Sequence, residues 1–369
     1  MVENIQYFMV YCNAKTFTLN VFALLVFYKA DFNMVTIRDI AERYGVSVAT
    51  VSKALNNQKD IGAKTKEEIR KLAKEMGYAP NAAAKELKTN KTHNLGVLFV
   101  DEGHSGLTHD YFNHVLDSFK NTAELKGYNM TFINCCKESE NRYTYLEQAR
   151  SRGFDGIVIA CVDYNDPEVV ELMKSDIPVV TIDYVFNEKI NVISDNNSGM
   201  RDLVKYVYSK GHRKIAYIHG EGTIVTRGRL TSFRKTCEEL GITVPKEYIK
   251  ASSFRDVEGA YKETLELLNL KDPPTCILYP DDFSSFGGIN AIYEKGLKIP
   301  EDISVAGYDG ITLAKCFRPQ ITTIVQDTKR IGEQAAKKLI SQIEKPETTL
   351  IEMVIVPGKV FEGSSVAEA

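Results

Sequence analysis

Apolar residues recur at helical spacing between residues 36 and 77, and polar residues mark where each predicted helix begins and ends. A first helix is predicted after Thr36, because Thr36 and Asp39 have the spacing of a capping box, and it ends at Gly45. Its apolar face carries Ile37, Ile40, Ala41 and Tyr44. A second helix follows Ser47, a good N-cap residue, after a very short turn. The pattern therefore predicts a helix-turn-helix.

A third helix is predicted to start at Thr65, which has Glu68 three residues further on, and to stop at Gly77. Together the three helices form one small all-α domain over residues 34–79. Residues 80–94 follow as PNAAAKELKTNKTHN, in which alanines favour a helix but Leu87 is the only large apolar side chain. Such a helix is marginal on its own, so we interpret this segment as a hinge helix and linker.

From residue 95 the period changes, and short, strongly apolar runs alternate with amphipathic helical segments. The runs are LGVLFV, MTFINC, GIVIAC, KIAYIHG, TCILYP and ISVAGY, and the helical segments cover 110–126, 139–152, 229–240 and 284–295. Strands this apolar are covered on both faces, which predicts parallel sheets with right-handed crossovers. We expect residues 95–369 to form two doubly wound parallel-sheet lobes, like a periplasmic binding protein, with chain crossovers near residues 195, 326 and 356.

Composition supports several domains and divides the charge unevenly. The 369 residues exceed what one core usually organises, and 44% hydrophobic with 26% charged residues is ordinary for a soluble globular chain. Residues 34–94 contain 12 Lys and Arg against 7 Asp and Glu, a net charge of +5. Residues 1–33 have no net charge. Because the whole chain has a net charge of −3, residues 95–369 carry −8. The basic segment suits contact with nucleic acid.

The first 33 residues contain the apolar stretch TFTLNVFALLVFY, from Thr16 to Tyr28. It is shorter than the roughly 18 residues that a membrane span needs. A signal peptide is one alternative, but no small-x-small cleavage pattern follows the stretch. We interpret residues 1–33 as a non-native or disordered N-terminal extension before Met34, and we expect no membrane partner.

Residues with reactive side chains show no arrangement typical of an enzyme or a metal site. The seven cysteines form no C-x-x-C pair, so we interpret them as buried reduced thiols, with a redox role for adjacent Cys135 and Cys136 as the alternative. His104, His109 and His114 recur every five residues, a spacing that turns a helix by about 140° and places them on different faces. We therefore expect no catalytic activity, no metal and no cofactor.

Three sequence motifs occur together at a specific spacing: TIRDIAERYGVSVATVSKALN, GYAPNAAAKEL and DISVAGYDG. In this combination the chain resembles the lactose/galactose repressor family of bacterial regulators, from about residue 35 to about residue 360. The resemblance implies a cytoplasmic, sequence-specific DNA-binding regulator, usually a repressor. It would bind a palindromic operator in double-stranded DNA as a homodimer, under control of a small effector, expected to be a sugar. The alternative is a soluble sugar-binding transport protein without DNA function.

The second helix is expected to present its N-terminal side chains to the major groove, with Thr36 and Asn56 placed to meet phosphates. The resemblance matches Val48, Ala49 and Lys53 to base-reading positions, whereas Thr50 also fits packing against the first helix. It also matches Leu87 to a wedge inserted into the minor groove. The complete predicted DNA-binding set is Thr36, Ser47, Val48, Ala49, Thr50, Lys53, Asn56, Asn81, Ala84 and Leu87.

Candidate effector contacts lie where strands end or helices begin, at the edge where such lobes bind ligands. Asp183 and Asp309 each end an apolar run, and Arg229 is placed near the start of a helix. Carboxylates, a guanidinium and aromatic faces together suit a polyhydroxylated ligand. With the resemblance, the predicted set is Tyr111, Phe112, Asp183, Arg229, Phe254, Asp281, Asp309 and Gln326.

The chain departs from the family pattern at three of these places. It has Asp281-Asp282 where the family usually has Asn-Asp, Ser232 where Gly is usual, and Asp309-Gly310 where Asp-Asp is common. The extra carboxylate leaves an amino or otherwise cationic sugar as an alternative to a neutral one. For each residue, a helix N-cap or a surface salt bridge remains the alternative structural role.

Overall fold

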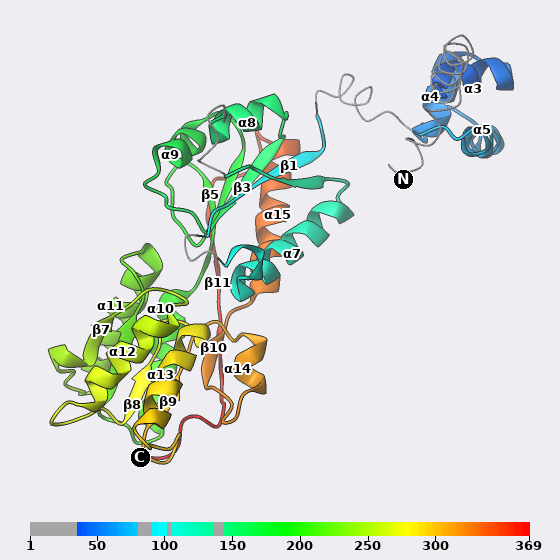
Figure 1. The fold of residues 1–369 in the computed structure, drawn as a ribbon. Helices are drawn as coiled ribbons and strands as arrows, with labels where there is room; N and C mark the ends of the chain where they lie inside the picture. The colour runs from blue at the N-terminus through cyan, green and yellow to red at the C-terminus, as the bar shows by residue number, and fades with distance from the viewer. Residues whose placement is uncertain (1–34, 80–90, 102–104, 136–142) are drawn as a thin grey trace, which may run out of the picture. The chain divides into compact units, whose positions relative to one another are not determined.

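The structure is a computed structural model that describes residues 35–79, 91–101, 105–135 and 143–369. The chain divides into two compact units, Met1–Lys88 and Thr89–Ala369, and Figure 1 shows the elements of each. The first unit contains the head domain and the second contains two lobes. The predicted fold class, an all-α head followed by an α/β body of parallel sheets, is confirmed.

The head consists of α3 (Ile37–Tyr44), α4 (Val48–Leu55) and α5 (Ala63–Glu75). The capping box predicted for α3 is present in both directions between Thr36 and Asp39, and Gly45 ends the helix with a left-handed φ of 76°. Ser47 caps α4 by accepting a hydrogen bond from the backbone N–H of Thr50. The helices enclose a small core of Ile40, Ala41, Val51, Ala54, Ile69 and Ala73.

The predicted start of the third helix is wrong by two residues. Helix α5 begins at Ala63 after Gly62, which provides no side-chain cap, so Thr65 lies inside the first turn. Ala63 and Lys64 are good helix formers and extend the helix before the polar pair that resembles a capping box. The predicted end agrees with the structure, because Gly77 adopts a φ of 72° just beyond the helix.

Lobe 1 comprises residues 91–194 and 328–356 around a six-stranded, entirely parallel sheet in the order β11-β5-β4-β3-β1-β2. Its strands are β1 (Asn94–Phe99), β2 (Asn129–Phe132), β3 (Gly156–Ala160), β4 (Val179–Ile182), β5 (Ile190–Ser194) and β11 (Met353–Val356). Helices α7 (Asp110–Leu125) and α15 (Thr328–Glu344) cover one face, whereas α8 (Tyr145–Ser151) and α9 (Pro167–Lys174) cover the other (Figure 1).

Lobe 2 comprises residues 196–325 and 359–369 around a four-stranded parallel sheet in the order β7-β6-β8-β9. Its strands are β6 (Ile215–His219), β7 (Ile249–Ala251), β8 (Cys276–Leu278) and β9 (Ser304–Ala306). One face packs on α10 (Asn196–Ser209) and α11 (Ile224–Glu239), and the other packs on α12 (Val257–Leu268), α13 (Asp282–Glu294) and α14 (Thr312–Cys316). Strands β10 (Thr323–Val325) and β12 (Lys359–Phe361) form a separate antiparallel pair.

The chain passes between the lobes at three places: from β5 into α10, from β10 into α15, and from β11 into β12. Strand β5 leads directly into lobe 2 at its carboxyl end, so the carboxyl ends of the parallel strands of lobe 1 lie at the crossovers. In lobe 2, Asp309 follows β9 and bridges to Val325 beside a crossover. The edges that bind ligands in such sheets therefore meet at the lobe junction.

Two predicted helix boundaries in the body need correction. The helix expected over 139–152 begins at Tyr145, because Thr144 and Glu147 form a capping box, and residues 136–142 lie outside the described part of the chain. Helix α11 begins at Ile224 rather than near residue 229, because Thr223 caps it by accepting from a backbone N–H. Arg229 consequently lies in the second turn of α11, not at its start.

The cysteines are only partly as predicted. Cys237 and Cys276 are buried, as expected from their apolar surroundings, but Cys135 and Cys161 are half-buried. Cys316 is exposed, because it is the last residue of the short surface helix α14. Cys12 and Cys136 lie outside the described residues.

Candidate functional site

Helix α4 has the two faces that a DNA-reading helix requires. Val51 and Ala54 are buried in the head core, whereas Val48, Ala49 and Lys53 are exposed. Val48 is a large apolar side chain that remains 47% exposed at the first turn of its helix. An exposed apolar side chain beside an exposed cation suits contact with thymine methyl groups and acceptor atoms of base edges.

Lys53 is held in an ion pair, with its Nζ atom 2.5 Å from Oδ2 of Asp60. The two side chains are 45% and 51% exposed, so the pair is a surface pair that contributes little stability. Nucleic acid can therefore replace Asp60 as the partner of Lys53 at small energetic cost.

Thr36 and Asn56 are helix caps, whereas Thr50 lies in the first turn of α4. The Thr36 hydroxyl donates to Oδ2 of Asp39 at 2.8 Å, and the Asn56 side chain donates to the Ser52 carbonyl at 2.8 Å. Thr50 is half-buried and lies 2.9 Å from the hydroxyl of Ser47. The predicted hinge residues Asn81, Ala84 and Leu87 lie outside the described residues.

In the body, lobe 1 contributes a carboxylate held by neutral donors. Asp183 follows β4 with a left-handed φ of 54°. Its Oδ2 atom accepts from the Tyr111 hydroxyl at 2.5 Å, and its Oδ1 atom accepts from the backbone N–H of Ser194 at 2.9 Å. Burial raises the pKa of Asp183, and these two hydrogen bonds oppose the increase because they favour the charged form.

Lobe 2 contributes a buried guanidinium. Arg229 is 4% exposed, donates from Nε to the Asn196 side chain at 2.7 Å and donates from Nη1 to the Pro280 carbonyl at 2.8 Å. Its guanidinium carbon lies 3.5 Å from the centre of the Tyr308 ring. Gly199 makes room for this ring, because a Cβ atom there would lie 2.2 Å from the Tyr308 hydroxyl. The guanidinium is therefore held in one orientation.

Asp309 forms an ion pair with this guanidinium. Its Oδ1 atom lies 3.9 Å from Nη2 of Arg229 and accepts from the Gln326 side chain at 2.7 Å. Burial raises the pKa of Asp309 to about 7, although Arg229 pulls it in the opposite direction. Phe254 lies on the same cluster, with its ring centre 5.7 Å from the guanidinium carbon of Arg229.

Asp281 and Asp282, at the start of α13, each have a structural role. Asp281 is the N-cap of α13 and accepts from the backbone N–H and the hydroxyl of Ser284, both at 2.8 Å. Asp282 is fully buried and accepts from the backbone N–H groups of Gly310 and Ile311 at 2.7 and 2.9 Å. Both residues therefore organise the loops around Asp309, whatever else they do.

The structure thus brings the predicted effector residues together in two groups. Tyr111 joins Asp183 in lobe 1, while Arg229, Asp309, Gln326 and Phe254 cluster where lobe 2 meets the crossovers. Phe112 instead packs edge-on against aromatic neighbours of lobe 1, with 5.8 Å to the ring of Phe99. Asp281 belongs to neither group and caps α13.

Two families match parts of the chain. Bacterial regulatory proteins of the lacI family match residues 36–81, and a periplasmic binding protein-like domain matches residues 204–366. The HTH-type transcriptional repressor PurR of Pectobacterium carotovorum is 33% identical over 316 residues, which is 84% of this chain and 91% of that protein. The PurR of Serratia proteamaculans is also 33% identical, over 91% of this chain and 98% of that protein. This chain belongs to the lacI family.

Solved structures of lacI-family proteins share its fold. The lac repressor dimer bound to operator and the anti-inducer ONPF superposes with a TM-score of 0.76 at 24% identity, covering 91% of this chain and 100% of that one. A LacI family regulator of Enterococcus faecium with bound ribose superposes with a TM-score of 0.64 at 26% identity, covering 75% of this chain and 99% of that one. The predicted function as a DNA-binding transcriptional regulator is confirmed, and the alternative of a transport protein is rejected.

Sequence reasoning on this lacI-family chain missed three residues around the site. Asn196 and Tyr308 orient Arg229, and Arg255 connects the two lobes. Tyr308 directly precedes a predicted contact, Asp309, and this position in the sequence could have indicated that it lies at the site. Asn196 and Arg255 are 33 and 145 residues from the partners they bind, and no local pattern records such contacts.

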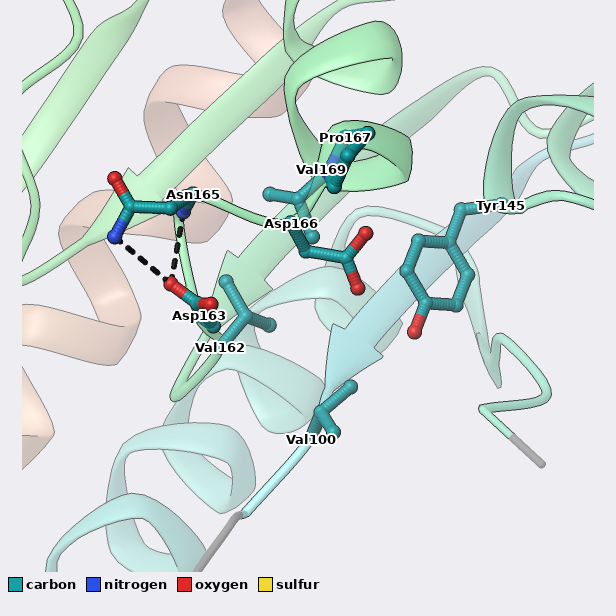
Figure 2. A pocket seen from close by; sticks show the side chains of 8 residues that line it. All are labelled: Val100, Tyr145, Val162, Asp163, Asn165, Asp166, Pro167 and Val169. Atoms are coloured by element: carbon teal, nitrogen blue, oxygen red, sulfur yellow. Dashed lines mark hydrogen bonds between the residues drawn. The ribbon is translucent and has the colours of Figure 1, made fainter. Parts of the chain in front are cut away.

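Lobe 1 of this lacI-family protein also has a cavity of about 270 Å³ away from these clusters, between the end of β3 and the starts of α8 and α9 (Figure 2). Figure 2 shows the Asp163 side chain accepting from Asn165, with Asp166 and Tyr145 across the hollow. Asp166 is the N-cap of α9, and its Oδ1 atom accepts from the backbone N–H of Glu168. The cavity therefore supplies no converging set of unoccupied polar groups. Its lining is Val100, Tyr145, Val162, Asp163, Asn165, Asp166, Pro167 and Val169.

Proposed function

We propose that this lacI-family regulator is a repressor whose binding to a palindromic operator in double-stranded DNA, as a homodimer, is controlled by a sugar held at the lobe junction. The observation that supports the ligand site is the cluster of Arg229, Asp309 and Asp183 at the carboxyl ends of strands and in the adjoining helix. Parallel α/β sheets bind their ligands at this edge.

The chemistry of the cluster suits vicinal hydroxyl groups. Arg229 gives two of its five donors to protein acceptors and has the others available toward Asp309. A hydroxyl group can accept from this guanidinium while donating to the carboxylate of Asp309 or Asp183. The half-buried ring of Phe254 lies beside the guanidinium and offers an apolar face for the C–H groups of a sugar ring. The ribose bound to the Enterococcus faecium relative supports the same ligand class.

The head would supply sequence recognition through the exposed face of α4. Val48 and Ala49 contact thymine methyl groups, Lys53 reads a base-edge acceptor, and Thr36 and Asn56 meet phosphates. The hinge residues Asn81, Ala84 and Leu87 complete the proposed DNA contacts. The lac repressor structure, a dimer on operator DNA, supports this arrangement.

We assign the protein no catalytic activity and place it in the cytoplasm. Its relatives are transcriptional repressors, which act where the chromosome lies. Within the described ranges, no helix combines the length and apolar character needed to cross a membrane.

Lys53 allows a direct test of DNA recognition. Lys53→Met removes the charged base reader, so selective binding to upstream genomic DNA should fall about tenfold or more against random competitor in a band shift. Lys120→Met is the matched control, because Lys120 is also 45% exposed and forms a surface pair, with Glu124. Equal loss in both variants, or no selective binding by the unmodified protein, would contradict the proposal.

The ligand class is tested by thermal unfolding of the full chain with D-ribose, neutral hexoses, D-glucosamine, sugar phosphates and nucleobases. A ligand that binds only the folded state raises the melting temperature. We expect a neutral sugar to raise it and Asp309→Asn to remove most of that increase. A shift with nucleobases alone would contradict a sugar effector while leaving the regulatory function intact.

A further inference from the structure

Arg255 connects the two lobes through its side chain. It belongs to lobe 2, in the loop between β7 and α12, and its partners belong to lobe 1. Its Nε atom donates to the hydroxyl of Ser105 at 3.0 Å, and its Nη1 atom donates to Oδ2 of Asp110 at 3.1 Å. The contact is therefore two hydrogen bonds, one of them an ion pair, between segments about 150 residues apart.

Lobe 2 fixes Arg255 before any contact with lobe 1 is considered. The backbone N–H of Arg255 donates to Oδ2 of Asp281 at 2.8 Å, and its φ is 59°, in the left-handed region. Its guanidinium carbon lies 4.2 Å from the centre of the Phe283 ring. These contacts within lobe 2 restrict the side chain, so less conformational entropy is lost when it meets lobe 1.

Lobe 1 presents a matching acceptor. Asp110 is the first residue of α7, where the helix dipole favours a negative charge. Oδ2 of Asp101 accepts from the backbone N–H groups of Ser105 and Gly106 at 2.7 and 3.0 Å, which fixes the segment that carries the Ser105 hydroxyl. Burial lowers the pKa of the adjacent His109, and the Arg255 charge lowers it further, so His109 adds no cation competing for Asp110.

We propose that Arg255 is a clasp, a polar side chain of lobe 2 that holds the two lobes together at their junction by binding Ser105 and Asp110 of lobe 1. The contact stabilises the arrangement in which Arg255 of lobe 2 touches lobe 1, called closed here. An effector that prefers the closed arrangement binds more tightly when the protein already populates it. The clasp depends on contacts within the protein and not on the chemical class of the effector.

The test uses the ligand-free full-length protein and the variants Arg255→Gln, Asp110→Asn and their combination. Each single variant should increase the radius of gyration in small-angle scattering. The double variant should increase it no more than Arg255→Gln alone, because the Asp110 ion pair is one of the two contacts that Arg255→Gln removes. Hydrogen exchange of the segment 105–110 should become about fivefold faster, the lower end of typical coupling factors between sites. Arg201→Gln removes a surface ion pair within lobe 2 and should change neither quantity.

An unchanged radius and unchanged exchange in the two single variants would overturn the proposal. Effects of Arg255→Gln and Asp110→Asn that simply add in the double variant would overturn it too, because the residues would then act independently. If Arg255→Gln does not fold, Asp110→Asn decides alone, since Asp110 is 36% exposed and its replacement keeps the side-chain shape.

Discussion

The two lobes present different kinds of polar group to their junction. In lobe 1, the carboxylate of Asp183 is already held by neutral donors, the Tyr111 hydroxyl and a backbone N–H. In lobe 2, the cation Arg229 stands beside a carboxylate whose pKa burial raises to about 7. Lobe 2 therefore supplies a fixed positive charge, Arg229, that can orient a ligand. Lobe 1 supplies a carboxylate, Asp183, that already accepts hydrogen bonds from the protein and can close over the ligand.

This difference follows from how each group is supported. Arg229 is fixed by Asn196 from α10, by the Pro280 carbonyl and by the Tyr308 ring, so three separate segments of lobe 2 fix one side chain. Asp183, directly after β4, is held by the Tyr111 hydroxyl from α7 and by the backbone N–H of Ser194 in β5, and neither donor carries a charge. Substitutions in lobe 2 should accordingly lower the affinity for a ligand more than substitutions in lobe 1.

The largest expected effect comes from removing the fixed charge of lobe 2. Arg229→Leu leaves the acceptors of Asn196 and Pro280 buried without their donor and leaves Asp309 without its cation. Removing one partner from a buried charged network costs about 3 to 5 kcal/mol. Urea unfolding should show this loss, and the same variant should abolish any ligand-induced rise in melting temperature.

Arg213→Leu is the matched control for this prediction. Its guanidinium carbon also lies over a tyrosine ring, 3.6 Å from the centre of Tyr208, and it donates to backbone carbonyls, but the residue is exposed. We expect a loss of about 1 kcal/mol or less, as for exposed cation–π contacts. Equal losses in both variants would remove the distinction drawn for lobe 2.

The fold could be predicted where signals are local. Thr36, Asp39 and Ser47 cap their helices through side chains three residues apart, and alternation of apolar runs with amphipathic helices indicated parallel sheets. The start of α5 could not be predicted, because Gly62 caps it without a side-chain bond. Helix propensity and a polar pair gave conflicting indications there, and propensity decided the boundary.

The site could be predicted only in part, because strand ends are readable and long-range contacts are not. Asp183 and Asp309 were found because each ends an apolar run. Both have positive φ angles, 54° and 101°, with Asp183 directly after β4 and Asp309 three residues after the end of β9. Arg229 was misplaced by a turn of helix, since the cap at Thr223 was not recognised. Arg255 was missed because its partner Asp110 is 145 residues away.

A smaller effect is expected from neutralising the carboxylate of lobe 2. Because burial raises the pKa of Asp309 from 3.8 to about 7, the folded protein keeps this proton where the unfolded chain has released it. Its contribution to stability is complete below about pH 4 and is lost as pH rises through about 7. At 1.36 kcal/mol per pKa unit, this rise corresponds to a loss of about 4 kcal/mol.

Asp309→Asn should therefore flatten the pH dependence of unfolding between about pH 4 and 8. Asp183 and Asp282 also have pKa values raised mainly by burial, so part of the decline remains in the variant. Urea denaturation of both proteins at several pH values measures the difference. If the free energy of unfolding depended on pH equally in both proteins, Asp309 would not be the titrating group. The difference drawn between the lobes would then not include a raised pKa in lobe 2.

The smallest effect is expected in lobe 1. Tyr111→Phe keeps the buried ring but removes the hydroxyl that donates to Asp183, at a cost of about 1.5 to 3 kcal/mol for a hydrogen bond to a carboxylate. The pKa of Asp183 should rise further, since this bond favours its charged form. Tyr261→Phe is the matched control, because its hydroxyl donates to Glu294 at the same 2.5 Å on the exposed surface, and we expect less than about 0.5 kcal/mol there. Tyr111→Phe and Arg229→Leu would contradict the comparison if they lowered the free energy of unfolding equally. The hydrogen bond from Tyr111 to Asp183 would then stabilise lobe 1 as much as the buried cation stabilises lobe 2.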